Sequence, residues 1–452
     1  MVFVHHTVTL FSIKMIILLN KFLFLILLNL IILINCHEDQ DDSLRNLKNM
    51  GKGFTNLNDY YVPENYNYYS GSFSEKYCKD AKYITIPLGT TGGLNEGSLS
   101  SFLLTKKGSN TFIALDAGTI WQGVRRLTTM NQFNNYFGIE YPEWAILPEQ
   151  RATWFIKNHI YGYFIGHSHI DHVGGLIIES PEDTLKKDML NSTIKTGLLG
   201  LIDKMQLEKK NYVFPNSVLQ MKTIVGLTNT IQSIKDDLFN GKVWPTLPLF
   251  GFFDYYVVEP RREYAFSSLS AYNTSILAPV INEFPYNLKV TPYDICHDTL
   301  ISTAFVFTDS LTGDQIVFFS DTGVPSPSNF QATCDWENKI FDVWRTIKID
   351  KLKAVYIESS FLDDAADTVM FGHLRPRDIM KLMDQLLIQS IQTSPPMKNL
   401  KHVKLIIEHI KPQVSKSDYG LTAQRLVYNQ LMKANTNSIK IIIPNQGDPI
   451  CI

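Results

Sequence analysis

The stretch Gly166–Pro181 reads Gly-His-Ser-His-Ile-Asp-His-Val-Gly-Gly-Leu-Ile-Ile-Glu-Ser-Pro. Its first half places three histidines and one aspartate within six positions, namely His167, His169, Asp171 and His172. Imidazole nitrogen and carboxylate oxygen are the ligands that borderline divalent ions such as Zn²⁺ prefer. Four ligands this close in a short loop cannot all reach one ion with good geometry. The spacing therefore predicts two ions side by side, with His167 and His169 on the first and Asp171 and His172 on the second.

Further ligands of a two-metal site are expected at strand ends, where loops from distant parts of the chain converge. His297 stands just before an apolar run, whereas Asp321 and His409 each follow one. A carboxylate at Asp321 can bridge two ions with its two oxygens. We therefore predict His297 on the first ion, His409 on the second, Asp321 on both, and a water shared between them.

Alternating strand and helix patterns surround these residues. Short β-branched runs end at glycine, proline, acidic or histidine residues, which is typical of strands, and longer stretches carry an apolar stripe at helical spacing. The expected strands are 83–89, 100–105, 111–118, 161–165, 316–320, 354–358 and 405–408, and the expected helices are 143–160, 377–391 and 423–432. This alternation predicts a layered α/β architecture.

A long segment of about 125 residues separates the metal loop from His297. It contains helical patterns at 183–208 and 217–239, then an aromatic, proline-rich stretch at 239–256. Because connections of this length are uncommon, we interpret 183–290 as an insertion that caps or walls the pocket, with its aromatic stretch as a candidate apolar surface for a ligand. The alternative is an elaboration of the fold that makes no contact with substrate.

These motifs resemble the metallo-β-lactamase superfamily, and the run from His167 to Pro181 is closer still to the class II cyclic-nucleotide phosphodiesterases. The loop of that family has the form His-x-His-Leu-Asp-His, then a short glycine-containing apolar stretch, then Ser-Pro or Ser-Ala; here Ile170 stands in the Leu position. Gly-His-Leu-Arg-Pro at 372–376 and His-Ile-Lys-Pro at 409–412 also resemble the family, and the likeness runs from about Tyr83 to Pro444. It implies an αβ/βα sandwich with the site at one edge.

The family includes secreted members from social amoebae. The resemblance implies metal-dependent hydrolysis of 3′,5′-cyclic AMP, and also of cyclic GMP, to 5′-nucleotides. The nucleophile would be a hydroxide shared between two divalent ions. It further implies that His373, held by Glu358, donates a proton to the leaving ribose oxygen, with Asp171 also part of the catalytic centre. The opposite assignment, with His373 on the second ion and His409 as the acid, stays open. Asp116 is expected to orient metal-bound histidines, and a plain turn aspartate is the alternative. The nitrogen-rich ligand set favours Zn²⁺.

The N-terminus has the pattern of a secretory signal. Residues 15–34 are almost entirely Leu, Ile, Phe and other apolar residues, Lys14 precedes them, and no acidic residue occurs before Glu38. A run of about 20 residues is also long enough to remain as a membrane anchor. We expect a signal peptide at 1–36, a polar leader at 37–80, with a peripheral arm packed on the core as the alternative, and a metallo-hydrolase domain at 81–452.

Secretion permits disulfides. The five cysteines are Cys36, Cys78, Cys296, Cys334 and Cys451, and if Cys36 leaves with the signal the other four can pair in three ways. The sequons at Asn191 and Asn273 predict N-glycosylation.

The 452-residue chain has a net charge of −2 and no basic block, which argues against a long nucleic-acid footprint. The expected partner is a small cyclic nucleotide, with membrane contact only through a retained signal. Two other functions remain open: another hydrolase of the superfamily, such as a lactamase, thioesterase or RNA 3′-processing nuclease, and a catalytically silent binding protein with structural metals. Against the last, structural sites fill their coordination shell, whereas this ligand set leaves room for water.

Overall fold

The computed structural model describes residues 78–178, 222–250, 253–269, 284–326, 334–393, 395–414 and 421–452. The expected signal peptide, nearly all of the leader, the helix predicted at 183–208 and both sequon residues, Asn191 and Asn273, lie outside the described residues. Within the described ranges, every helix is too short or too polar to cross a lipid bilayer.

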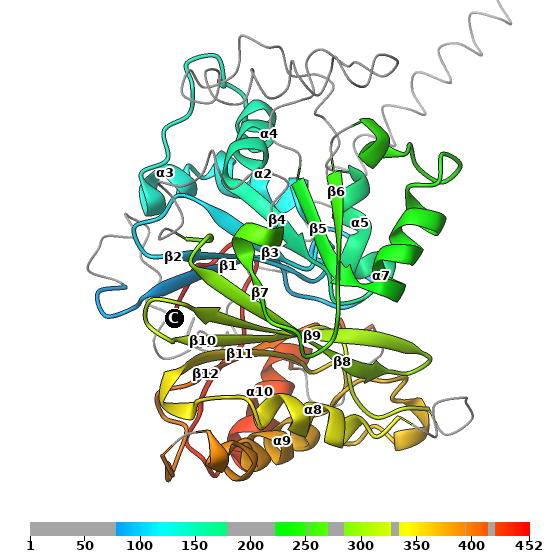
Figure 1. Ribbon diagram of the computed structural model, residues 1–452, viewed down its shortest axis with the longest axis vertical. Coiled ribbons are helices and arrows are strands. Elements are labelled where there is room, and N and C mark those ends of the chain that lie inside the picture. The colour runs from blue at the N-terminus through cyan, green and yellow to red at the C-terminus, as the bar shows by residue number, and fades with distance from the viewer. Residues whose placement is uncertain are drawn as a thin grey trace, which may run out of the picture. The chain divides into compact units, whose positions relative to one another are not determined.

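Two seven-stranded mixed sheets form the centre of the domain (Figure 1). In spatial order the first sheet consists of β14 (Ile450–Cys451), β1 (Tyr83–Gly89), β2 (Ser101–Lys106), β3 (Phe112–Leu115), β4 (Ile160–Phe164), β5 (Lys222–Leu227) and β6 (Phe253–Val258). The second consists of β13 (Lys440–Ile442), β12 (Lys404–Glu408), β11 (Leu352–Glu358), β10 (Gln315–Phe319), β9 (Leu300–Asp309), β8 (Leu288–His297) and β7 (Tyr264–Ala265).

Helices cover the outer face of each sheet, so the layers run helix, sheet, sheet, helix (Figure 1). Those of the first half are α2 (Trp121–Thr129), α3 (Gln132–Phe137), α4 (Pro148–His159), α5 (Ile170–Ile178), α7 (Thr228–Ser233) and the π-helix η4 (Ile234–Leu238). Those of the second half are α8 (Trp336–Trp344), α9 (Pro376–Gln389) and α10 (Ala423–Ala434). Short 3₁₀ turns are η5 (Leu247–Phe250), η6 (Phe266–Leu269), η8 (Ile349–Lys351), η9 (Asp367–Val369) and η10 (Ser390–Gln392).

Aromatic side chains pack between the two sheets. Phe102 of β2 meets Tyr356 of β11 edge to face, with ring centroids 5.4 Å apart. Phe164 of β4 meets Phe305 and Phe307 of β9 in the same way, at 5.5 and 5.0 Å. Such offset contacts add to the free energy of burying large apolar surfaces. The predicted αβ/βα sandwich is confirmed.

The strand directions bring polar residues to one edge of the sandwich. β10, β11 and β12 are parallel and almost wholly buried, and their apolar sequences suit strands covered on both faces. Because parallel strands end at the same edge, the residues that follow them are neighbours: Asp321, Glu358 and His409. β3 and β4 are also parallel, and Asp116 and the metal loop follow them.

The helix predicted at 217–239 is wrong in part: residues 228–238 are helical, as α7 and η4, but the residues before them are not. Residues 222–227, expected within a helix, form strand β5, because Lys-Thr-Ile-Val-Gly-Leu is rich in β-branched residues and pairs with both β4 and β6. Within the aromatic stretch 239–256, Phe239 and Phe253 are buried in the core of the first half and Tyr255 packs against it. Strands β5 and β6 therefore extend the first sheet, whereas 183–221 and 270–283 of the predicted insertion lie outside the described residues.

Two disulfides choose one of the three pairings that the sequence left open. Cys78–Cys451 joins the start of the described chain to β14, across a sequence separation of 373 residues. Cys296–Cys334 fixes the end of β8 to the segment before α8. The second bond occupies the sulfur of Cys296, which adjoins His297, so this thiol is not a candidate metal ligand.

Candidate metal centre

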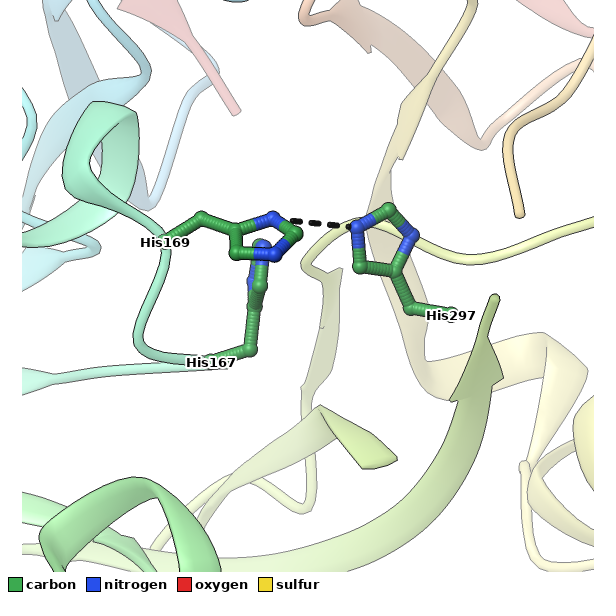
Figure 2. Close-up of side chains that lie close together, drawn as sticks. All are labelled: His167, His169 and His297. Atoms are coloured by element: carbon green, nitrogen blue, oxygen red, sulfur yellow. Dashed lines mark hydrogen bonds between the residues drawn. The ribbon is translucent and has the colours of Figure 1, made fainter. Parts of the chain in front are cut away.

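The metal loop connects β4 to α5. His167 and His169 lie in the loop, and Asp171 and His172 lie in the first turn of α5. His297, at the end of β8, faces the loop: its Nε2 is 3.3 Å from Nδ1 of His169, as Figure 2 shows. Nitrogens of His167, His169 and His297 all lie within 4.8 Å of one another. These are the three histidines that the sequence predicted for the first ion.

Asp321, directly after β10, stands at the centre of the cluster. Its Oδ2 is 3.2 Å from Nε2 of His409 and 3.3 Å from Nε2 of His172. The same oxygen is 3.8 Å from Nε2 of His297 and 3.9 Å from Nε2 of His167. One carboxylate thus faces histidines of both predicted ligand sets, which is the arrangement a bridging ligand needs.

A second group of donors lies on the other side of Asp321. Nε2 of His409 is 3.1 Å from Oδ2 of Asp171, and these two residues and His172 have donor atoms within 4.8 Å of one another. His409 has a positive φ of 55°, and a Cβ on Gly92 would lie 2.3 Å from its ring. The chain therefore needs glycine at 92 to let His409 reach this position.

His373 lies beside this group but has a different partner. Its Nδ1 is 2.9 Å from both oxygens of the buried Glu358. Ser360 links Glu358 to His409: its hydroxyl is 2.5 Å from Oε2 of Glu358 and 2.8 Å from Nδ1 of His409. On the opposite side of the ring, Nζ of Lys411 is 3.1 Å from Nε2 of His373.

Proximity alone leaves His373 within reach of an ion. Donor atoms of His297, Asp321, Glu358 and His373 also lie within 4.8 Å of one another. Of the two histidines that competed for the second ion, however, it is His409 that contacts Asp171. His373 is turned toward Glu358.

Asp116 holds the metal loop in place. Its Oδ2 accepts a hydrogen bond from Nδ1 of His172 at 2.7 Å and from the Ser320 hydroxyl at 2.8 Å, and its Oδ1 accepts one from the Gly166 backbone at 2.7 Å. Fixing Nδ1 of a histidine in this way directs Nε2 toward a metal. The residue itself has a φ of 52°, which aspartate tolerates better than most residues.

The imidazoles of the first group are held neutral. Burial lowers the pKa of His167 well below its ordinary value, and neighbouring imidazoles lower it further. Burial also lowers the pKa of His169 and brings that of His297 to about 4. Neutral imidazole is the form that binds a metal ion.

The second group favours a cation at its centre. Burial raises the pKa of Asp321, but His409 and His172 outweigh burial and hold this pKa well below the ordinary value. Burial lowers the pKa of His172, but Asp321 and Asp116 outweigh it and raise this pKa well above the ordinary value. Positive charge is thus stabilised where the predicted ions would lie.

These residues fit divalent metal ions. Nε2 of His167 is buried and has no hydrogen-bonding partner among the described residues, as expected for a nitrogen whose partner is a metal. Nδ1 of His297 bonds the Gly372 carbonyl at 3.0 Å, which leaves Nε2 to face the cluster. The donor set of imidazoles and carboxylates is one that binds divalent transition metals.

A model of the class-II cAMP phosphodiesterases matches residues 78–447. The chain belongs to this family. It is 62% identical to the Dictyostelium discoideum cAMP/cGMP-dependent 3′,5′-cAMP/cGMP phosphodiesterase A, over 93% of this chain and 92% of the relative. Phosphodiesterase 7 of the same organism is 60% identical, over 90% of this chain and 96% of the relative. The predicted family and enzyme class are confirmed.

Among solved structures, this phosphodiesterase is similar to unliganded yeast PDE1. The TM-score is 0.60 at 17% sequence identity, and the match covers 82% of this chain and 100% of the yeast chain. At this identity the likeness concerns the fold alone. It agrees with the sandwich described above.

Several contacts in the phosphodiesterase site were missed from the sequence. Ser320 and Ser360 each follow the end of an apolar run, one or two residues from a predicted site residue, and that position was the available signal. The Gly93 backbone donates to Oδ2 of Asp171 at 3.0 Å, and Lys411 contacts His373. Nothing in the spacing pointed to these two contacts.

Close packing explains several glycines and histidines near and away from the site. A Cβ on Gly118 would lie 2.1 Å from the Asp171 carbonyl and one on Gly175 would lie 2.6 Å from the Ala117 carbonyl, so both positions need glycine, whereas Gly174 has room. His159 and His402, which lie outside the metal cluster, hydrogen-bond the Asn110 and Ile349 carbonyls.

Proposed function

We propose that this phosphodiesterase hydrolyses both 3′,5′-cyclic AMP and 3′,5′-cyclic GMP to the 5′-nucleotides. The names of the two Dictyostelium relatives, which give both cyclic nucleotides, support this range of substrates. The observation that carries the proposal is the position of Asp321. One of its two carboxylate oxygens, Oδ2, lies between two groups of histidines, and the Glu358–His373 pair lies beside it.

We assign two divalent ions to the site, and Zn²⁺ is the favoured ion for so many nitrogen ligands. The first ion would be held by His167, His169, His297 and Asp321, and the second by Asp171, His172, His409 and Asp321. When bound, such a pair neutralises the phosphodiester and supplies a nucleophile at neutral pH.

The proton for the leaving group is assigned to His373. Hydrolysis breaks the bond from phosphorus to the ribose 3′-oxygen, and that oxygen must take up a proton. Glu358 accepts from Nδ1 of His373 and so fixes the ring with Nε2 directed away from the carboxylate. Lys411 places its ammonium group 3.1 Å from Nε2, where an anionic substrate would be attracted.

The activity is tested with purified protein, loaded with Zn²⁺ or stripped with a chelator, on cyclic AMP and cyclic GMP. The loaded protein should release the 5′-nucleotide from both, and the stripped protein from neither. Elemental analysis should find two ions per chain. A loaded protein that hydrolyses neither substrate contradicts the proposal, and one ion per chain contradicts the two-metal assignment.

We also propose that the protein is secreted and glycosylated. The apolar run at 15–34 and the two disulfides, which persist in oxidising compartments, support secretion. N-terminal sequencing of the extracellular protein should begin near residues 35–37, and an intact N-terminus would mean a retained anchor. Enzymatic removal of N-glycans should lower the apparent mass if Asn191 or Asn273 is modified.

A further inference from the structure

Phe371 is an exposed aromatic residue next to the metal centre. It is 54% exposed, and every other Phe, Tyr or Trp whose side chain the structure describes is more buried. Met370 before it and Leu374 after it are fully buried. One exposed apolar side chain is ordinary by itself. The backbone conformation of Phe371, however, is unusual for a phenylalanine.

Phe371 occupies a turn position that disfavours phenylalanine. The His373 backbone donates to the Met370 carbonyl at 3.0 Å, and the two central residues, Phe371 and Gly372, have φ of 50° and 79°. Two successive positive φ angles are those of a type I′ turn, which prefers Gly, Asn or Asp. A bulky residue there is an outlier, and such strain is found preferentially at ligand-binding sites.

The surrounding chain holds this turn rigidly. The Gly372 backbone donates to the Val324 carbonyl at 2.8 Å, and a Cβ on Gly372 would lie 2.1 Å from the Asp298 nitrogen. The buried Arg375 donates to the Ala365 carbonyl at 2.8 Å and to Asp367 at 2.6 Å, which fixes the preceding loop. A ring presented by a rigid turn loses little conformational freedom when a ligand binds.

The same turn carries parts of the proposed active site. His373 is two residues from Phe371, and two residues span at most about 7 Å. The Gly372 carbonyl accepts from Nδ1 of His297 at 3.0 Å, which links the turn to the first histidine group. A cyclic nucleotide whose phosphate lies at the cluster has its base on the other side of the ribose, and a base directed toward this turn would reach the exposed Phe371.

We propose that Phe371 is the surface on which the purine base of the cyclic nucleotide stacks; this assignment rests on the proposed function. Stacking on an aromatic ring is tolerant of sequence because every base has a π face. The same contact therefore accommodates adenine and guanine. In the aromatic stretch 239–256, which the sequence suggested as a ligand surface, Phe239 and Phe253 are instead buried in the core.

The test compares Phe371→Asn with the wild type on three substrates: cyclic AMP, cyclic GMP and the base-free 1′-deoxyribose 3′,5′-cyclic phosphate. Asparagine suits the turn better than phenylalanine, so the variant should fold at least as well. We expect KM for both nucleotides to rise about tenfold to a hundredfold with kcat little changed, because the contact is made equally before and in the transition state. The base-free substrate should be hydrolysed as by the wild type.

The variant Phe371→Tyr keeps an aromatic ring and should have the wild-type KM. Val369 is an exposed apolar residue of the same loop, and Val369→Ala serves as the matched control. An unchanged KM for cyclic AMP in Phe371→Asn overturns the proposal. An equal loss on the base-free substrate also overturns it, since the turn would then act by positioning His373. Failure of the wild type on all three substrates would instead contradict the proposed function.

Discussion

Strand β10 has a buried aspartate at each end, and the two have opposite surroundings. Asp314, just before the strand, contacts Nζ of Lys82 at 2.7 Å and Nζ of Lys353 at 3.1 Å. Asp321, just after the strand, meets the Nε2 atoms of four histidines between 3.2 and 3.9 Å.

The difference shows how one residue type serves structure or chemistry. Two lysine ammonium groups neutralise the charge of Asp314. The neighbouring Asp309 is likewise hydrogen-bonded by Lys106 and Tyr83, each at 2.8 Å. The histidines around Asp321 leave donor atoms on both sides of the carboxylate, where the proposed divalent ions would complete the charge balance. A buried carboxylate is therefore a candidate for catalysis when its partners are themselves metal ligands.

The largest expected effect is the loss of activity in Asp321→Asn. An amide cannot bridge two ions as a carboxylate does, so kcat/KM for cyclic AMP should fall by about a thousandfold or more. The purified variant should also contain less metal. Asp314→Asn is the matched control and should keep wild-type kinetics and metal content; if both variants lose activity alike, the contrast between the two ends of β10 is wrong.

The next effect separates the two histidines beside Asp321. His373→Ala should keep both ions and lose about a hundredfold to ten-thousandfold in kcat, as removal of a general acid does. His409→Ala should lose an ion. Metal content and single-turnover rates measured on both variants give the answer. The reverse pattern, with metal lost from His373→Ala, would exchange their roles.

A smaller effect is expected from Asp116→Asn. Asparagine adopts positive φ readily, so the turn should survive, but the hydrogen bond that orients His172 is weakened. Metal affinity or activity should fall by about tenfold to a hundredfold. Titration with a competing chelator measures the affinity, and wild-type affinity in this variant would mean that Asp116 is only a turn residue.

The smallest effect on activity, and the clearest on stability, concerns the other end of β10. Burial raises the pKa of Asp314, but hydrogen bonds from Lys82 and Thr312 outweigh it and hold the pKa below its ordinary value. A lowered folded pKa means that the ionised carboxylate stabilises the fold above the unfolded pKa of about 3.9, and that this is lost as pH falls through the folded pKa.

Asp314→Asn should therefore lower the free energy of unfolding at pH 7 by about 1–2 kcal/mol, a moderate value because Lys82 is half exposed to screening solvent. The difference from the wild type should be constant above about pH 5 and shrink below about pH 4. Urea unfolding across this range is the measurement. A difference that grows as the pH falls would contradict the sign of the pKa shift.

The sequence by itself determined the donors and their approximate neighbourhood. His167, His169, Asp171 and His172 are so close in the chain that local geometry keeps them together. Asp321 and His409 follow apolar runs, and parallel buried strands bring their ends to one edge of a sheet. The layered α/β architecture followed from the alternation of short apolar runs and amphipathic helices, and the family resemblance implied its sandwich form.

Only the tertiary structure decided which distant residues touch. His409 rather than His373 lies against Asp171, 238 residues away in the chain, and the cysteine pairing, the strand at 222–227 and the contact of Lys411 with His373 were likewise open. The physical reason is that periodicity describes how a segment buries its own faces. Which segments then become neighbours depends on sheet order and side-chain packing across the whole domain, and no local pattern encodes it.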